Sequence, residues 1–169
     1  MKFIKLFLIS IVFLFLVATC LGLLFPSTVV VSRVIDITAP KDSIYSFTKN
    51  INGWKKWIDG LNDTTVNMST PLKASLGNTM VTITQTNNEE RVVTSIWETK
   101  NNGTQESKIE IFQQKGQMTA AVHWQFIQHI GWYPWERFAS MMNDKIMGTM
   151  MEKNLNNLKT QAETQAETH

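Results

Sequence analysis

The side chains that could carry out acid–base, nucleophilic or metal chemistry are few and scattered along this sequence. Its single cysteine, Cys20, stands in an uncharged segment near the N-terminus. Nucleophilic catalysis needs a nucleophile, a base and a group that orients the base, and no motif of that kind is present. The three histidines, His123, His129 and His169, do not have the spacing of zinc ligands. The pattern therefore predicts neither a metal centre nor a bound cofactor.

Three carboxylates stand where an internal cavity could contain them. Glu98 falls within a predicted strand, Asp36 near the end of another, and Glu136 at the start of a predicted helix. A solvated surface charge is the more usual role for such residues. His123 alternates with Trp124 along its strand, so it is expected on the outer face of the sheet. The sequence therefore does not favour catalysis, and an enzyme stays open as an alternative.

Aromatic and methionine residues are concentrated in the stretch "GWYPWERFASMMNDKIMGTMMEKNLNNLK", residues 131–159. Trp132, Tyr133 and Trp135 surround a proline, and five methionines follow in a helical pattern. Methionine is unbranched, so it adapts to irregular packing or to varied apolar ligands. These methionines could line a pocket, although a core stripe is the more common explanation. The rings could seal or frame one end of the domain, or lie at a membrane interface, which tryptophan and tyrosine favour.

The segment Leu6–Phe25 contains 20 residues without a charge and is dominated by Leu, Ile, Val and Phe. As a helix it would be about 30 Å long, the thickness of the hydrocarbon core of a bilayer. An uncleaved single-pass anchor is the favoured interpretation, and a cleaved signal peptide or a lipidated cysteine within "VATC" are the alternatives. Lys2 and Lys5 precede the segment. The positive-inside rule therefore places the N-terminus in the cytoplasm and the following domain on the extracytoplasmic side.

Charge divides the chain into two parts. The sequence has 16 basic and 14 acidic residues, and the only charges in the first 25 positions are two lysines. The remaining chain therefore carries 14 residues of each sign. A neutral domain without lysine or arginine clusters lacks the electrostatic footprint of a nucleic-acid-binding protein. We therefore expect no nucleic-acid partner, and the oligomeric state is left open.

After the apolar segment, the pattern is that of one α+β domain with a curved antiparallel sheet. Residues 27–40 alternate like a strand, with Arg33 interrupting the apolar side, and residues 41–53 follow as a helix. A weak strand is expected at 64–69 and a loop at 70–78. Further strands, separated by tight-turn sequences, are expected at 79–86, 91–100, 105–114 and 117–128. Strands joined by such short turns form an antiparallel meander.

A long helix that begins at Trp135 is expected to cover the concave face of this sheet. Its apolar positions recur at helical spacing over about six turns, and Gly148 is the one weak point in the pattern. Met142 and Ile146 are expected to be buried against the sheet. The final "QAETQAETH" is expected to be a frayed helix end or a disordered tail.

Both ends of this domain resemble one family. The string "ITAPKDSIYSFTKNINGWKKWIDGL" resembles the opening of START-like, polyketide-cyclase-like proteins of the SRPBCC superfamily, matched here by Ile37, Ala39, Pro40, Trp54 and Trp57. The strings "VHWQF" and "WERFASMMNDKIMGTMMEKNLNNLK" are similar to the last strand and final helix of its bacterial members. Over residues 28–160, the resemblance implies a helix-grip fold with a cavity between sheet and helix. Family members commonly bind hydrophobic small molecules there, but cyclases share the fold, so the fold does not decide between binding and catalysis.

These observations predict three regions: an N-terminal membrane anchor at 1–26, a helix-grip domain at 27–160 and a disordered tail at 161–169. The favoured function is a membrane-tethered module that binds a hydrophobic small molecule or lipid. The alternatives are a cyclase- or dehydratase-like enzyme, or an envelope protein whose cavity is filled by its own side chains. The candidate cavity-lining residues are Trp97, Trp124, Trp135, Phe138, Met142, Ile146 and Met150.

Overall fold

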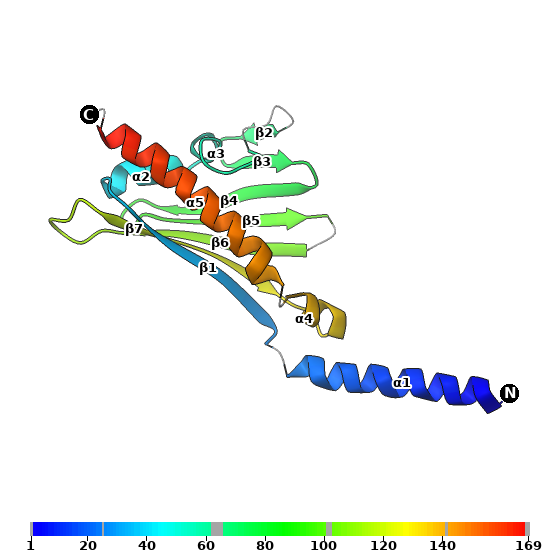
Figure 1. Ribbon diagram of the computed structural model, residues 1–169. Coiled ribbons are helices and arrows are strands. Elements are labelled where there is room, and N and C mark those ends of the chain that lie inside the picture. Colours follow the sequence, from blue (N-terminus) through cyan, green and yellow to red (C-terminus); the bar gives the residue numbers. More distant parts are fainter. Residues whose placement is uncertain (1, 25, 62–65, 101–102, 141, 168–169) are drawn as a thin grey trace.

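The computed structural model describes residues 2–24, 26–61, 66–100, 103–140 and 142–167. Its first element, α1 (Lys2–Leu23), projects away from the rest of the chain (Figure 1). Nearly all of this helix is exposed, and the stretch Phe3–Leu23 is long and apolar enough to cross a membrane. Phe25, the last residue of the predicted span, lies outside the described residues. The length and apolar character indicated by the sequence are therefore present in one helix.

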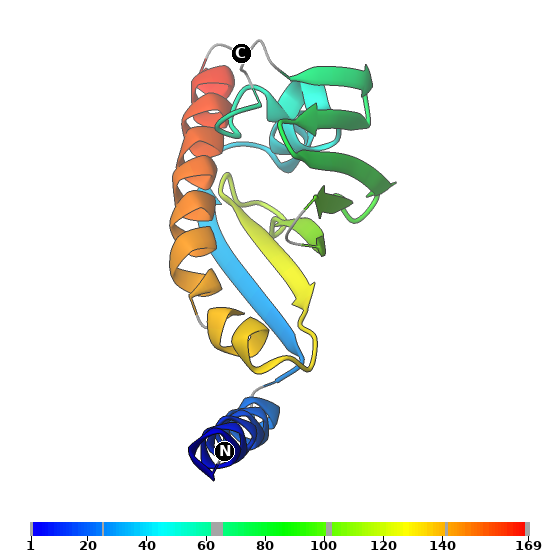
Figure 2. The ribbon, with the colours of Figure 1, turned by 90° about the vertical axis from the view of Figure 1, so that its right-hand side faces the viewer.

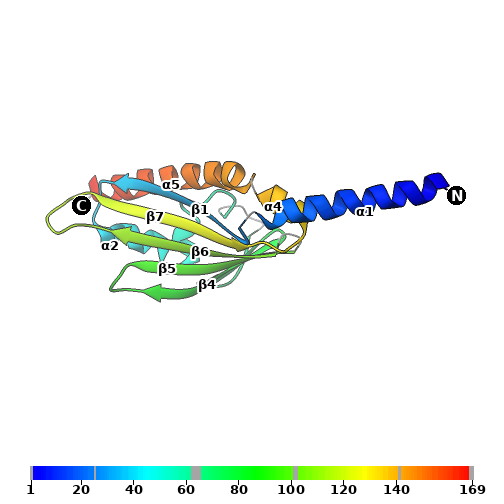
Figure 3. The same cartoon turned by 90° about the horizontal axis from the view of Figure 1, so that it is seen from below.

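In the described part of the chain, seven antiparallel strands form one curved sheet (Figures 1 and 3). Its strand order is β1-β7-β6-β5-β4-β3-β2, so the first strand pairs with the last. The strands are β1 (Thr28–Ile37), β2 (Asn67–Thr70), β3 (Lys73–Leu76), β4 (Thr79–Asn87), β5 (Val92–Thr99), β6 (Gly103–Phe112) and β7 (Ala120–His129). The predicted meander corresponds to β4 to β7. The predicted loop at 70–78 is wrong, because it contains β3, a strand too short for its alternation to be recognised.

Two short helices, α2 (Lys41–Thr48) and α3 (Ile51–Trp54), follow β1, and α2 lies beside the C-terminal part of the last helix (Figure 2). Gly53 allows them to pack closely, because a Cβ at this position would lie 2.7 Å from the carbonyl carbon of Phe47. The indole N–H of Trp57 donates to the carbonyl oxygen of Phe47 at 3.0 Å. Trp54 and Trp57, the two tryptophans of the family motif, therefore lie in a compact corner. There the backbone of α2 accepts a hydrogen bond from the side chain of Trp57, which follows α3.

The predicted C-terminal helix is divided into α4 (Pro134–Ser140) and α5 (Asn143–Glu167). Helix α5 runs along β1 and across the concave side of the sheet (Figures 1 and 2). It continues through most of the predicted tail, where Ala162 is fully buried and Glu163 accepts a hydrogen bond from the backbone N–H of Thr38. The doubled "QAET" places Ala162 and Ala166 four residues apart, on one face of the helix. This small apolar face packs residues up to Glu167 onto the domain.

Candidate ligand-binding site

The concave face of the sheet is filled with aromatic side chains beneath α3 and the middle of α5. Trp54 stacks on Trp97 with ring centroids 6.0 Å apart, and the centroids of Trp57 and Trp124 are 5.3 Å apart. The indole N–H of Trp124 donates to Oγ of the buried Ser107 at 2.8 Å. The polar atom of this ring is therefore satisfied without water. This part of the concave face is occupied by the protein's own side chains.

At the end of the sheet next to α1, the concave face is only partly covered. Gln128, Gln105 and Trp97 lie opposite one another on β7, β6 and β5, and each is partly exposed. Gln105 Nε2 donates to Gln128 Oε1 at 3.2 Å, and the hydroxyl groups of Thr79 and Thr99 are 3.0 Å apart. We call these five residues the near-end floor. It combines one aromatic surface with polar groups that hydrogen-bond to each other.

Helix α5 carries two apolar ridges, and they differ in burial. The buried ridge consists of Met151, Leu155 and Leu158, which have at most 1% of their surface exposed. The bare ridge consists of Met142, in the turn immediately before α5, and of Ile146 and Met150 on α5, which are 60%, 67% and 41% exposed in that order. The prediction that Met142 and Ile146 are buried against the sheet is therefore wrong. The apolar pattern shifts by one residue at Met150 and Met151, which turns the helix face by about 100°, and the later ridge is the one that meets the core.

The bare ridge lies on a side of α5 that is covered further along the helix. Asn157 Nδ2 donates to the Trp57 carbonyl and to Asp59 Oδ1, both at 3.2 Å. Ile146 precedes Asn157 by 11 residues, which is three helical turns, so both point to the same side. The segment after α3 thus covers this side in the second half of α5. In the first half, the same side carries apolar residues that remain exposed.

Asn154 stands at the boundary between the covered and the exposed part of this side. It is buried, with 1% of its surface exposed, and its Oδ1 accepts the backbone N–H of Asp59 at 3.0 Å. Its Nδ2 has no hydrogen-bond partner among the described residues. Exchanging the amide oxygen and nitrogen would place two donors against each other, so the Asp59 contact fixes the orientation. An unpaired buried donor costs about 1–3 kcal/mol unless an acceptor is supplied.

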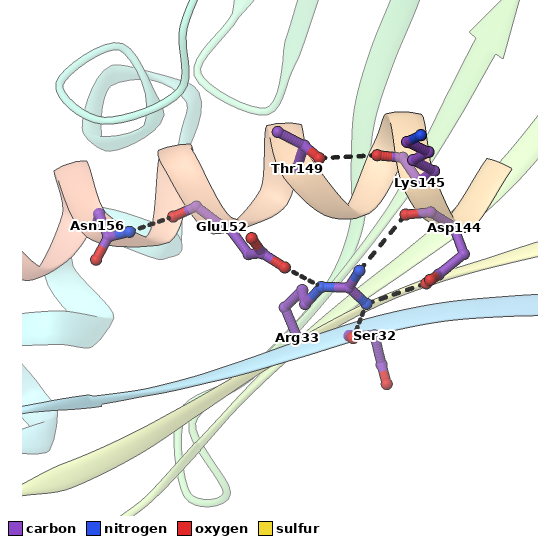
Figure 4. Close-up of polar contacts among 7 residues, drawn as sticks. All are labelled: Ser32, Arg33, Asp144, Lys145, Thr149, Glu152 and Asn156. Carbon is purple, nitrogen blue, oxygen red and sulfur yellow. Dashed lines mark hydrogen bonds and ion pairs between the residues drawn. The ribbon is translucent and has the colours of Figure 1, made fainter. Parts of the chain in front are cut away.

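Ion pairs attach the first half of α5 to β1 (Figure 4), and the partly buried Met147 also packs against the core. Arg33 Nε donates to Glu152 Oε1 at 2.6 Å and Arg33 Nη1 donates to Asp144 Oδ1 at 3.0 Å. Nη1 also donates to the carbonyl of Ser32 at 2.8 Å. The hydrogen bonds that Arg33 donates to Asp144 and then to Glu152 raise the pKa of Arg33 above its ordinary value. We call Arg33, Asp144 and Glu152 the arginine clasp.

Gly148 lies under the arginine clasp, halfway between its two carboxylates. A Cβ on this glycine would lie 2.6 Å from Arg33 Cζ and 3.2 Å from Arg33 Nε, so a side chain would displace the guanidinium. Arg33, which interrupts the apolar side of β1, therefore packs against Gly148, which weakens the helix. The glycine lowers the stability of the helix but leaves room for the arginine clasp.

The residues that could carry out chemistry do not converge. The three candidate carboxylates, Asp36, Glu98 and Glu136, are all exposed. His123 lies on the face opposite the buried Trp124, as its alternation predicts, with Nδ1 3.4 Å from Glu110 Oε2. Lys108 hydrogen-bonds to Glu110, which lowers the pKa of that carboxyl. Across the described residues, no three histidine, cysteine or carboxylate side chains are grouped so that they could hold a metal ion. The arrangement offers apolar surface and amides rather than an acid–base pair.

The predicted cavity-lining residues are separated by the structure. Trp124 belongs to the aromatic filling, Trp97 belongs both to this filling and to the near-end floor, and Met142, Ile146 and Met150 form the bare ridge. Trp135 is exposed on α4, and the side chain of Phe138 lies outside the described residues. The role of these residues in ligand binding remains a prediction. Gln105, Gln128 and Asn154 were not predicted, because single amides on strands and helices form no motif.

A pocket of about 620 Å³ lies at the opposite end of the domain from α1. Its walls include Pro40 from the turn after β1, Met118 from the β6–β7 connection and Ala166 from the end of α5. This pocket was not predictable from the sequence, because its three walls come from segments far apart in the chain. Met118 is almost fully exposed there.

No protein-family model matches this chain, and no curated protein matches it in sequence. Among solved structures, a protein from Nitrosospira multiformis has a TM-score of 0.61 at 15% identity, covering 79% of this chain and 96% of that one. A norcoclaurine synthase from Thalictrum flavum has a TM-score of 0.61 at 12% identity, covering 80% and 94%. A START superfamily protein from Mycobacterium smegmatis has a TM-score of 0.59 at 12% identity, covering 80% and 97%.

Identities this low support conclusions about architecture alone. The pairing of the first strand with the last, the two short helices after β1 and the long C-terminal helix agree with the arrangement that the sequence resemblance implies. The structural similarity extends over about four-fifths of the chain. The chain therefore has a START-like, helix-grip fold.

Proposed function

We propose that this protein is a membrane-tethered module that binds a hydrophobic small molecule or lipid between the near-end floor and the bare ridge of α5. The observation that supports this most directly is the exposure of Met142, just before α5, and of Ile146 and Met150 along it. Burying apolar surface contributes about 25 cal/mol per Å², so such a row favours an apolar occupant. Methionine side chains adapt to ligands of different shape.

A polar group at one end of this site adds a second expected property of the ligand. Asn154 follows Met150 by one helical turn, and its buried Nδ2 lacks an acceptor among the described residues. A carbonyl, ester or hydroxyl oxygen on the ligand would complete this hydrogen bond and remove the cost of the unpaired donor. The expected ligand is therefore largely apolar, with an oxygen acceptor at one end. Fatty acids and their esters have this form.

The proposed tether is α1. The helix contains a 21-residue apolar stretch, and Lys2 and Lys5 stand at its start. The positive-inside rule then places the domain on the extracytoplasmic side. Four residues separate Leu23, the last residue of α1, from Thr28, the first of β1. A tether this short would hold the near end of the sheet directly at the membrane surface.

An enzyme is the second candidate, because one is found among the structures with this fold. Norcoclaurine synthase from Thalictrum flavum has been solved in complex with dopamine and hydroxybenzaldehyde. An active site usually shows ionisable residues with perturbed pKa values in a cleft. In this chain, Glu98 and Glu136 are exposed at separate places on the surface. That distribution favours binding without chemistry.

Native mass spectrometry of the full chain in detergent tests the proposal. We expect a co-purified species with the mass of a lipid-sized molecule, and uptake of a fluorescent fatty acid by ligand-free protein. Met150→Trp should reduce both by filling the site. Met118→Trp, the same substitution on an exposed methionine at the other end of the domain, is the matched control and should leave both unchanged.

Two outcomes would contradict the binding function. If the folded parent carries no ligand and takes up no probe, a structural role replaces the proposal. If the protein converts an apolar substrate and Glu98→Gln or Glu136→Gln abolishes that turnover, the enzyme is the better description. Asn154→Leu tests the polar end of the site separately from the apolar part. It should weaken binding of a fatty-acid ester more than binding of a plain alkane.

A further inference from the structure

The C-terminal end of α1 is in contact with α4. The carbonyl oxygen of Gly22 accepts a hydrogen bond from Arg137 Nη1 at 3.3 Å, and Arg137 Nε donates to the carbonyl of Gly131 at 3.1 Å. A Cβ on Gly22 would lie 3.3 Å from Pro134 Cα, so the two backbones pack closely. Arg137 is buried by this arrangement. A cation at the end of a helix is also favoured by the helix dipole.

Three aromatic rings are stacked and exposed beside this contact. The ring centroids of Trp132 and Tyr133 are 4.4 Å apart, and those of Tyr133 and Trp135 are 4.8 Å apart. The three side chains are 52%, 38% and 58% exposed, in the same order. We call them the aromatic cluster. Leu23 and Leu24, at the end of α1, are also exposed, so the apolar surface of the helix continues onto the domain.

We propose that the aromatic cluster lies in the headgroup layer of the bilayer that α1 crosses. Tryptophan and tyrosine favour this layer because the ring is apolar while the N–H or O–H reaches water. The end of the apolar part of α1 marks the boundary of the hydrocarbon core, and the contacts of Gly22 with Pro134 and Arg137 hold the cluster at that depth. The inference rests on the tether proposed above.

A lipid surface fits this patch better than a protein partner. The patch is continuous with a helix that is apolar on all sides and exposed along its length. It consists of aromatic and leucine side chains, the composition of a membrane-interface segment. With the cluster in the headgroup layer, the near-end floor faces the membrane at short range. An apolar ligand would then reach the domain from the lipid without crossing bulk water.

Fluorine NMR on the full chain, labelled with 5-fluorotryptophan and placed in phosphatidylcholine nanodiscs, tests this inference. Trp→Phe substitutions assign the six tryptophan signals. A lipid with a nitroxide on its headgroup should broaden Trp132 and Trp135 strongly. Trp54 and Trp57, which are fully buried in the domain, are internal controls and should keep narrow lines.

A second measurement separates this inference from the tether. Cys20, the only cysteine, lies in α1, so it should be protected from a membrane-impermeant maleimide in nanodiscs. Protected Cys20 with Trp132 and Trp135 no broader than Trp54 would overturn the placement of the aromatic cluster and leave the tether standing. Reactive Cys20 would overturn the tether, and this inference with it. Broadening of both exposed rings together with protected Cys20 is the expected result.

Discussion

The two halves of α5 are attached to the same sheet in different ways. In the second half, Leu155, Leu158 and Ala162 are buried among the core residues. In the first half, the arginine clasp holds the helix to β1, while the bare ridge is exposed. Apolar burial contributes stability in proportion to area, whereas a partly exposed ion pair contributes little. The second half of the helix therefore contributes more to the folding core, and the first half, where Met147 and Met151 also pack against it, is attached more weakly.

This difference fits a binding module. A helix that is anchored at one end and weakly attached at the other can move away from the sheet locally, without unfolding the domain. The Asn154 amide, with its unpaired donor, lies where the two halves meet. A ligand seated there would contact both the fixed and the movable part of α5. The two halves should therefore respond differently to the same substitution.

The same substitution in each half should give the largest contrast. Leu155→Asp places a charge in the core, and an unpaired buried charge commonly costs more than about 3 kcal/mol. We expect this variant to lose its cooperative unfolding transition. Ile146→Asp changes an exposed side chain, so its free energy of unfolding should stay within about 0.5 kcal/mol of the parent. Circular dichroism during chemical denaturation measures both. Equal destabilisation by the two substitutions would show that the bare ridge is part of the core.

A substitution at the corner of α2 and α3 should have an intermediate effect. Gly53→Ala brings a methyl group against the backbone of Phe47, which cannot move aside as a side chain would. Overpacking of this kind costs about 1–3 kcal/mol, measured as the free energy of unfolding. Asn52→Ala, at the neighbouring exposed position, is the control and should change stability little. If both variants have the same free energy of unfolding, the corner of α2 and α3 accommodates the added methyl group, and its packing is less tight than the structure implies.

The fold was predictable from the two ends of the domain, but the face of α5 that packs against the sheet was not. Alternation and turn sequences identified the meander, and a single long apolar helix is what such a sheet needs as a cover. The pattern contains two ridges that meet at Met150 and Met151, both with helical spacing. Spacing alone cannot show which ridge faces the sheet, because that depends on where Trp57 and Trp124 have already filled the space.

The polar parts of the site were not predictable for a related reason. Arg33 and Gly148 each look like a local defect, one in a strand and one in a helix, and they are 115 residues apart. Only the fold shows that the glycine makes room for the guanidinium. Likewise, the orientation of the buried Asn154 amide is fixed by the backbone N–H of Asp59, on a different segment of the chain. The site depends on contacts between residues that are far apart in the sequence, and local periodicity does not reveal such contacts.

Substituting Gly148 tests the weakly attached half of α5, with a smaller effect. Helix propensity alone predicts that Gly148→Ala stabilises the protein by about 1 kcal/mol. The arginine clasp predicts otherwise, because the methyl group displaces Arg33 from both carboxylates. We expect this variant to unfold at or below the denaturant concentration of the parent. In an Arg33→Val background the obstacle is gone, and the same change should then stabilise by about 1 kcal/mol. An equal gain in both backgrounds would contradict the contact between Arg33 and Gly148.

The smallest effect is expected on the outer face of the sheet, where Glu110 pairs with Lys108 and faces His123. The hydrogen bond from Lys108 is the main cause that lowers the pKa of Glu110, against the opposing effect of partial burial. Because the folded pKa lies below the unfolded one, this group stabilises the fold fully above the ordinary pKa of glutamate. That contribution is lost as the pH falls through the lowered folded value. Lys108→Met brings the two pKa values together, so the free energy of unfolding should depend less on pH in this acid range, by less than about 1 kcal/mol. Denaturation curves at a series of pH values measure the slope, and an unchanged slope in Lys108→Met would show that Lys108 does not hold the charge of Glu110 in solution.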